Sequence, residues 1–298
     1  MQDRLGFRRA FRARLTNFNR HRVAIAAALG LTVLAAAATA IPTLAVAPAA
    51  KPVEQPALWV VSDADTTIYL FGTFHALDER TDWLARPIRA AFDSADELVL
   101  ETVVPSDPKD LFDVLTRHRL IPTPVAGAPV VATDSKSFAD AARATMAAGR
   151  SAGLSPDRGA DAVLRHIAVA EGKPVDGLES FDFQLGMVRT LPVLTGSAAV
   201  PVGTPSPDVR QQLLDMRSAW KRGDGSDVAA VLGHLEAQSP TVYQRLFVDR
   251  NRHWASWIAD RMSRPGTVFV AVGAGHLIGR DSVQQKLAGH GYRTTRVN

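Results

Sequence analysis

Two histidines occupy the same kind of position in this chain, three residues after a glycine that ends an apolar run. Residues 66–75 read TTIYLFGTFH and residues 267–276 read TVFVAVGAGH. β-Branched and aromatic residues are frequent in both runs, which is typical of buried strands. In α/β sheets the chemistry usually lies just beyond the strand ends, and a glycine there lets the backbone bend or approach another group closely. The candidate site residues are therefore His75 and His276, with Gly72 and Gly273 as motif glycines.

Two carboxylates follow further predicted strands. Glu101 ends the strand expected at 97–101, and Glu179 ends a shorter one at 173–179. Two neutral imidazoles with one carboxylate form a common ligand set for a catalytic divalent metal, with one position open for water. His75, Glu101 and His276 are thus the predicted metal ligands, with Glu179 as general base or additional ligand. The alternative is that each histidine caps a turn or fills a polar niche, and the repeated pattern favours the site.

A long helix expected over 241–262 adds two polar residues to a mostly apolar face. Asn251 falls inside its apolar stripe and Arg250 lies beside it, whereas His253 is expected on the outer face. Buried polar groups need partners, so Arg250 and Asn251 are predicted to point into a site built by the strand ends. Arg250 could stabilise a developing oxyanion. Alternatively, the stem of Arg250 packs while its head reaches solvent. The stripe consists of Phe247, Trp254, Ile258 and Met262.

The elements that must position these groups alternate between strands and helices. A hairpin is expected from a strand at 58–61 and the strand before His75, followed by a helix at 84–94. Helical spacing dominates from residue 107 to about 201. The pattern predicts an α/β fold, a mixed β-sheet with flanking helices, as a single globular domain over 58–298. The strands around Ile68 and Val268 are apolar on both sides and should be adjacent at its centre.

The amino-terminal segment predicts export. Residues 1–22 contain seven arginines and precede an uncharged run whose part at 23–46 is read as a signal-peptide core or a transmembrane anchor. Small-residue cleavage patterns occur at 38–40 and 45–47, and residues 47–57 form a linker rich in proline and alanine. A buried helix would leave the arginines unexplained. The remainder is expected in the periplasm, either soluble or anchored to the inner membrane by the uncleaved segment.

Charge and composition exclude several classes of function. The net charge is +4, but residues 1–22 contribute +6, so the remainder carries −2. No basic face is therefore expected on the globular part, which argues against nucleic-acid binding. The chain has no cysteine, which excludes disulfides, thiolate ligands and a cysteine nucleophile. The sequence also lacks His-Glu-x-x-His, Gly-x-Ser-x-Gly and phosphate-loop motifs.

Taken in their order along the chain, the two Gly-x-x-His motifs and the segments around the other candidate residues resemble the TraB/GumN family. That family is related to the Tiki proteins. The resemblance covers residues 58–298 and implies a mixed α/β fold. By analogy with Tiki it also implies a metal-dependent peptidase outside the cytoplasm, with manganese or cobalt as the metal and zinc as a third candidate. Two loops, 122–133 and 195–208, follow no motif of the family. The matched segments are Leu58-Trp59, GTFH at 72–75, ADELVLE at 95–101, GLE at 177–179, Arg250-Asn251 with Trp254, and VGAGHL at 272–277 with Gly279. The family's functional positions fall on His75, Glu101, Arg250 and His276.

The leading hypothesis is an exported metal-dependent hydrolase that cleaves peptides or another small-molecule substrate. A second hypothesis is a non-catalytic envelope protein that binds haem or a small ligand, since histidine also ligates haem iron. A third is an envelope scaffold linked to polysaccharide or peptide signalling, in which the histidines are structural.

Overall fold

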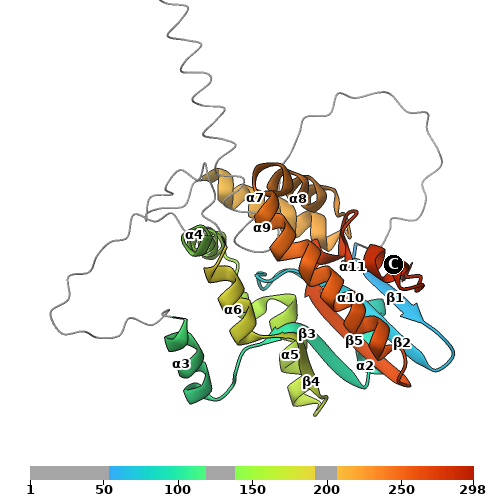
Figure 1. Cartoon of the computed structure of the whole chain (residues 1–298). Helices are drawn as coiled ribbons and strands as arrows, with labels where there is room; N and C mark the ends of the chain where they lie inside the picture. The colour runs from blue at the N-terminus through green and yellow to red at the C-terminus, as the bar shows by residue number, and fades with distance from the viewer. Residues whose placement is uncertain (1–53, 119–137, 192–206) are drawn as a thin grey trace, which may run out of the picture.

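A six-stranded mixed sheet with helices on both faces forms the centre of the protein (Figure 1). The structure is a computed structural model, and it describes residues 54–118, 138–191 and 207–298. The strand order is β4-β3-β5-β2-β1-β6. The mixed α/β fold expected from the sequence is confirmed. The strands are β1 (Leu58–Ser62), β2 (Thr66–Thr73), β3 (Glu97–Val103), β4 (Val175–Ser180), β5 (Gly266–Gly273) and β6 (Thr295–Arg296).

The first two strands form the predicted hairpin. They pair antiparallel with Val61 opposite Ile68. The carboxylate of Asp63 closes the turn by accepting the amide of Thr66 at 2.9 Å, which is typical of Asp in a tight turn. The last strand, β6, is only two residues long and pairs with β1 at the sheet edge.

β2 and β5 are adjacent and parallel, with Ile68 opposite Val268, as predicted. β5 also pairs in parallel with β3, and β3 with β4. The carboxyl ends of four strands therefore meet at one edge of the sheet. This arrangement brings residues that are far apart in the sequence to one place.

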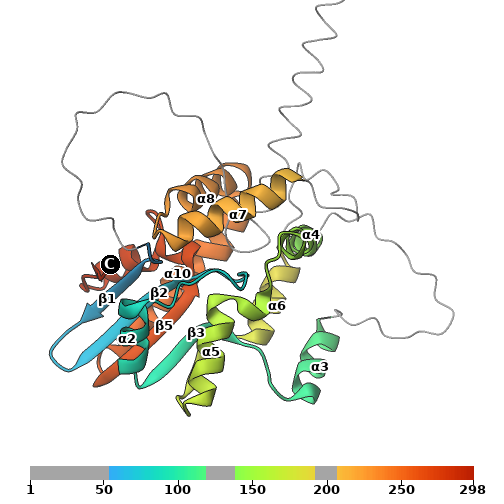
Figure 2. The same ribbon diagram turned by 180° about the vertical axis from the view of Figure 1, so that it is seen from behind.

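Different helices cover the two faces of the sheet. α10 (Asp249–Arg261) and α11 (Val283–Gly289) pack on one face, and α10 crosses in front of the sheet in Figure 1. α2 (Arg86–Ser94) and α5 (Ala160–Ala170) pack on the other face, which Figure 2 shows. Both faces of β2 and β5 are thus buried, as their apolar sequences require. The remaining helices are α3 (Pro108–Arg117), α4 (Phe138–Ser151), α6 (Phe181–Arg189), α7 (Pro207–Lys221), α8 (Ser226–Gln238) and α9 (Pro240–Tyr243).

The helix expected over 241–262 has an irregular turn that the sequence did not predict. A π-helical segment, Gln244–Val248, separates α9 from α10, and the amide of Asp249 donates to the carbonyl of Gln244. The wider turn shifts the helical register, so Phe247 packs in one hydrophobic core and Trp254 in the other. Such segments are frequent at functional sites, and this one ends two residues before Arg250.

The predicted export segments, 1–22 and 23–46, lie outside the described residues, as do the loop at 122–133 and most of the loop at 195–208. In the part of the chain that is described, no helix has the length and hydrophobicity needed to cross a bilayer. Export and the domain boundaries therefore stay predictions.

Candidate active site at the strand ends

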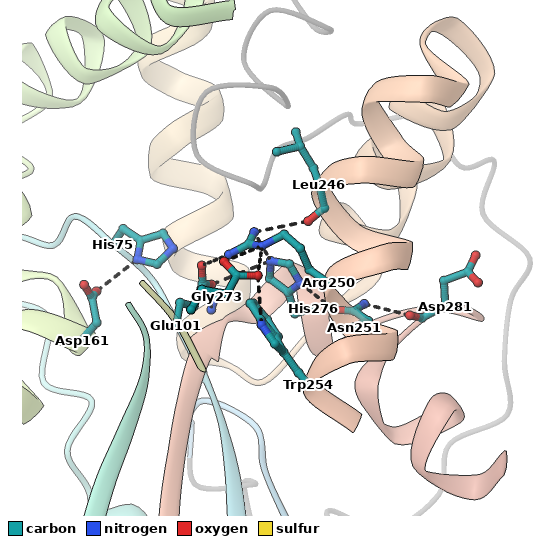
Figure 3. Close-up of polar contacts among 11 residues, drawn as sticks. His75, Glu101, Asp161, Leu246, Arg250, Asn251, Trp254, Gly273, His276 and Asp281 are labelled. Atoms are coloured by element: carbon teal, nitrogen blue, oxygen red, sulfur yellow. Dashed lines mark hydrogen bonds and ion pairs between the residues drawn. The ribbon is translucent and has the colours of Figure 1, made fainter. Parts of the chain in front are cut away.

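Gly273, at the end of β5, lies where the ends of the neighbouring strands bring two functional side chains together. β3 contributes Glu101, and the turn after β2 contributes His75 (Figure 3). The amide of Gly273 donates to Glu101 Oε1 at 2.6 Å. A Cβ added to Gly273 would lie 3.0 Å from Glu101 Oε1 and 3.0 Å from His75 Nε2. Any larger residue would crowd these two atoms, which explains the glycine of the second motif.

The first turn of α5 holds His75 in place. The amide of Ala160 donates to the carbonyl of Phe74 at 3.0 Å, and a Cβ on Gly159 would overlap the carbonyl oxygen of His75. Asp161 Oδ1 lies 3.2 Å from His75 Nδ1. Because an ionised carboxylate only accepts, Nδ1 carries a proton. The Nε2 atom is then the ring nitrogen that faces Glu101.

His276 is held more tightly than His75, and in a single tautomer. Its Nδ1 lies 2.6 Å from Asn251 Oδ1, and the amide nitrogen of Asn251 donates to the carbonyl of Asp281 at 2.8 Å. An arginine nitrogen, Arg250 Nη1, lies 3.2 Å from His276 Nε2. Arginine can only donate, so Nε2 is the acceptor and Nδ1 carries the proton. The ring is buried between Phe247 and Trp254, with centroids 4.9 and 4.4 Å away.

Arg250 connects the carboxylates of two strands. Its Nε donates to Glu179 Oε1 at 2.8 Å and its Nη2 to Glu101 Oε2 at 2.8 Å. Its Nη1 also donates to the carbonyl of Leu246, within the π-helical segment, at 3.2 Å. The guanidinium lies over the ring of Trp254, whose Nε1 donates to Glu179 at 3.0 Å. Planar guanidinium groups suit such multiple contacts, which a lysine cannot reproduce.

The charges of these groups differ sharply. Burial alone would lower the pKa of His75, but the charge and hydrogen bond of Asp161, together with Glu101, raise it to about 9. Burial lowers the pKa of His276 to about 3, and the positive Arg250 adds to the effect. Burial favours the neutral form of Glu101, but Arg250 and the charged His75 hold the pKa of this carboxyl well below its usual range. A charged His75 therefore lies beside a carboxylate, while His276 stays neutral.

The structure brings together nearly all the site residues predicted from the sequence. Arg250 and Asn251 are buried and point toward the strand ends, whereas His253 is exposed, as expected. Among the described contacts, Gly72 does not touch the titratable groups directly. The absence of a side chain at Gly72 makes room for Ala274, and its carbonyl accepts a hydrogen bond from Trp220 Nε1 at 2.7 Å. The chemical role of each residue stays a prediction. The assembled residues are His75, Glu101, Glu179, Arg250, Asn251, Gly273 and His276.

Comparison with known families identifies the family of this chain. The profile of the TraB/PrgY/gumN family matches residues 57–124 and 126–296. The chain belongs to the TraB/PrgY/gumN family. The resemblance noted in the sequence is thereby confirmed. Comparisons with curated proteins and with solved structures found no match.

Sequence reasoning missed two contributors to the site of this TraB/PrgY/gumN protein. Asp161 orients His75, and Gly159 allows α5 to approach the first motif. An aspartate in the first turn of a helix is common for electrostatic reasons alone, so Asp161 carried no distinctive signal. The preceding glycine, just before an apolar helix, was the only local feature that could have drawn attention to it.

Two histidines and one carboxylate are the groups that could hold a metal ion at this site. Both histidines direct Nε2 toward Glu101, while Nδ1 is engaged by Asp161 or Asn251. Metal-bound histidines are usually held in this way, with the second ring nitrogen bonded to a carboxylate or carbonyl oxygen. As the side chains stand, no three His, Asp or Glu residues in the described ranges are arranged to hold one ion. Instead, Arg250 Nη1 occupies the Nε2 of His276, at 3.2 Å. The two histidines and Glu101 fit a metal once the contact between Arg250 and His276 is broken.

A cavity of about 250 Å³ lies beside the site and not within it. Its walls include Gly72 and Ala274 from the two motifs, together with Trp59 and Trp220, but neither histidine. It is mainly apolar, and the titratable groups converge elsewhere. The strand-end cluster, and not this cavity, is therefore the candidate active site.

Proposed function

We propose that this protein is an exported metal-dependent hydrolase that cleaves peptide bonds. The observation that carries the proposal is the common orientation of the two histidines. Each has its Nδ1 bonded to an oxygen of a neighbouring side chain and its Nε2 turned toward Glu101. A histidine that served only to fill a polar niche would have no reason to direct its second nitrogen to the same carboxylate.

His75, His276 and Glu101 are the proposed ligands, with manganese, cobalt or zinc as the ion. Such a metal lowers the pKa of bound water and polarises the carbonyl under attack. The protein contributes fixed orientations, since Asp161 and Asn251 each hold one imidazole. Glu101 is kept ionised by Arg250 and by the charged His75, so it is ready to bind a cation at neutral pH.

Arg250 is proposed to act on the substrate oxygen. Its Nε stays bonded to Glu179, and Trp254 holds Glu179 from the other side. When the Nε2 of His276 is needed as a ligand, the Nη1 of Arg250 becomes free to donate to an oxygen that gains negative charge. A positioned donor of this kind contributes mainly in the transition state. Glu179 acts here as the partner of Arg250, although a role as general base stays a prediction.

Metal binding and turnover, measured in matched variants, test the proposal. The wild type is incubated with Mn²⁺, Co²⁺ or Zn²⁺, and metal content and cleavage of a mixed peptide library are recorded. His75→Ala and His276→Ala should lose metal and activity together, whereas His253→Ala, exposed on α10, should keep both. Arg250→Lys should keep the metal and lose about 10²-fold in turnover, as expected for one displaced oxyanion donor. Unchanged metal content in both histidine variants would refute the site.

A non-catalytic protein is the second candidate, and one observation favours it. Arg250 already satisfies Glu101, Glu179 and His276 at once, so the cluster is a closed ion-pair network as it stands. Absorbance of protein purified from its own host separates a haem protein, which would show a Soret band, from the hydrolase. A protein that holds neither metal nor haem, with the histidine variants merely less stable, would support a structural role.

Export is proposed from the arginine block and the following apolar run. The test is a fusion of residues 1–57 to a reporter enzyme that is active only outside the cytoplasm. We expect activity from this fusion, and its loss when the arginines of residues 1–22 are replaced by glutamates.

A further inference from the structure

Two threonines lie on either side of Gly273 in the sheet. Thr73 pairs directly with Gly273 across β2 and β5. On the other side β3 pairs with β5 as far as Leu100 and Ala271, and continuing this register by two residues brings Thr102 of β3 level with Gly273. Level residues of parallel strands point to the same face. The preceding row agrees, since Phe71, Ala271 and Leu100 all pack in one core.

The residue between the two threonines has no side chain. The position of its missing Cβ is 3.0 Å from both His75 Nε2 and Glu101 Oε1. Neighbouring strands lie about 4.8 Å apart, so the Cβ atoms of Thr73 and Thr102 lie roughly that far to either side. We call the space over Gly273, bordered by His75, Glu101 and the two threonines, the Gly273 cradle.

Both hydroxyls that flank the cradle lack a partner in the described part of the chain. Thr73 is fully buried, and neither its Oγ1 nor the buried Oγ1 of Thr102 has a hydrogen bond there. Buried hydroxyls are normally bonded. Thr66 of the same strand as Thr73 shows the usual case: it is equally buried, and its Oγ1 donates to the carbonyl of Arg264 at 3.0 Å.

We propose that Thr73 and Thr102 are ligand-contacting residues whose hydroxyls bind an oxygen-bearing polar group, water or substrate, held in the Gly273 cradle. A valine would fit either strand position as well and would leave no unpaired group. The hydroxyls therefore have a use that the fold itself does not supply. They stand beside the two groups proposed for the chemistry, so the inference rests on the proposed function for the nature of the reaction. The geometry of the cradle does not depend on that function.

Isosteric substitutions test the inference on the metal-free protein. Thr73→Val and Thr102→Val remove only a hydroxyl, and their denaturation midpoints should fall less than that of Thr66→Val, because neither hydroxyl bonds a protein group within the described residues. Thr66→Val is the matched control and should lower the midpoint, because it breaks a bond of the fold. Midpoints of Thr73→Val and Thr102→Val that fall as far as that of Thr66→Val would overturn the inference.

Occupancy of the cradle is read from a high-resolution crystal structure. An oxygen atom of water or ligand should lie within hydrogen-bond distance of Thr73 Oγ1 and Thr102 Oγ1 in the wild type and be absent in the double valine variant. A structure in which protein groups bond both hydroxyls would refute the inference even if the protein proves to be a metal-dependent hydrolase. Conversely, an oxygen in the cradle of a protein that binds no metal would retain the inference and refute the proposed function.

Kinetics then separate water from substrate in the active protein. Each valine variant should lose about 3- to 10-fold, the equivalent of one neutral hydrogen bond. A loss confined to kcat assigns the hydroxyls to the attacking water, and a rise confined to KM assigns them to bound substrate. Thr73→Ser and Thr102→Ser should recover most of the loss. Unchanged kcat and KM in both valine variants would overturn the inference.

Discussion

His75 and His276 follow the same Gly-x-x-His pattern, but the fold gives them opposite surroundings. The side chain of His75 is 32% exposed and faces a carboxylate, Asp161, whereas that of His276 is 2% exposed and lies between an amide and Arg250. The pKa of His75 is raised to about 9, and that of His276 is lowered to about 3. The repeated motif thus fixes where each ring stands, while the neighbours contributed by α5 and α10 decide its charge.

In the proposed metal site, this difference would give the two histidines different tasks. His276 is neutral at pH 7 and has only to exchange the donor of Arg250 for the ion. His75 must first lose a proton, which couples binding to pH. His276 would therefore be in the protonation state that binds a metal already at pH 7, whereas His75 would bind one only after a deprotonation that depends on pH.

Replacing Arg250 should cause the largest loss of folding stability. The change acts directly on the surroundings of His276. Arg250→Met leaves the buried carboxylates of Glu101 and Glu179 without their counter-ion. Loss of one partner from a buried pair costs about 3–5 kcal/mol, so urea denaturation should show a fall of this size in the free energy of unfolding. Arg252→Ala is the control, since Arg252 is exposed and pairs only with Asp249 in its own helix among the described contacts. A fall of less than about 1 kcal/mol for Arg250→Met, the size typical of surface pairs, would show that the network contributes little.

Exchanging the types of side chain bonded to Nδ1 of the two rings should move the two pKa values in opposite directions. Asn251→Asp gives His276 a carboxylate, and Asp161→Asn gives His75 an amide. A nearby opposite charge shifts a pKa by roughly 1–3 units, so the pKa of His276 should rise and that of His75 should fall. NMR titration of the imidazole resonances of the metal-free protein measures both. If neither pKa moves, burial and not the partner on Nδ1 determines the charges.

Stability should depend on pH with opposite signs at the two histidines. The folded pKa of His75, about 9, exceeds the unfolded value of 6.5, so its stabilisation is complete below pH 6.5 and is lost as the pH rises through 9. The folded pKa of His276 lies near 3, so its share is present above pH 6.5 and is lost as the pH falls toward 3. Each slope is at most one proton, about 1.4 kcal/mol per pH unit. Thermal denaturation of the metal-free protein between pH 4 and pH 10 gives both slopes.

Glutamine variants assign the slopes to the rings. His75→Gln should flatten the profile above pH 6.5, and His276→Gln should flatten it below. A profile that both variants leave unchanged would mean that other groups control stability over this range.

The centre of the fold was predictable from the sequence, because its pattern allows few alternatives. Strands that are apolar on both sides must lie inside a sheet, so the segments around Ile68 and Val268 had to be neighbours. Parallel neighbours end at the same edge, and this places His75 beside His276 without further information. The polar residues of α10 could be identified because Asn251 interrupts an apolar stripe.

The other features of the site could not be predicted, because they depend on contacts between residues that are far apart in the sequence. Nothing near Glu179 indicates that its partners are Arg250 and Trp254, which lie in a distant helix. The π-helical segment has the same apolar spacing as an ordinary helix, so periodicity could not reveal it. Asp161 looks like any acidic residue in a first helical turn. The protonation of each ring therefore became visible only in three dimensions.

The parallel pairing of β2 with β5 also constrains how the molecule is made. These strands are neighbours, yet nearly the whole described chain separates them, with Thr66 opposite Gly266. Contacts between such distant residues form slowly, because a long loop must close before they are gained. A chain that emerges from its amino end has the β1–β2 hairpin and β3 long before the strand that joins them. A chain that lacks β5 has no sheet centre and no second histidine, so the candidate site at the strand ends cannot assemble until β5 has been made.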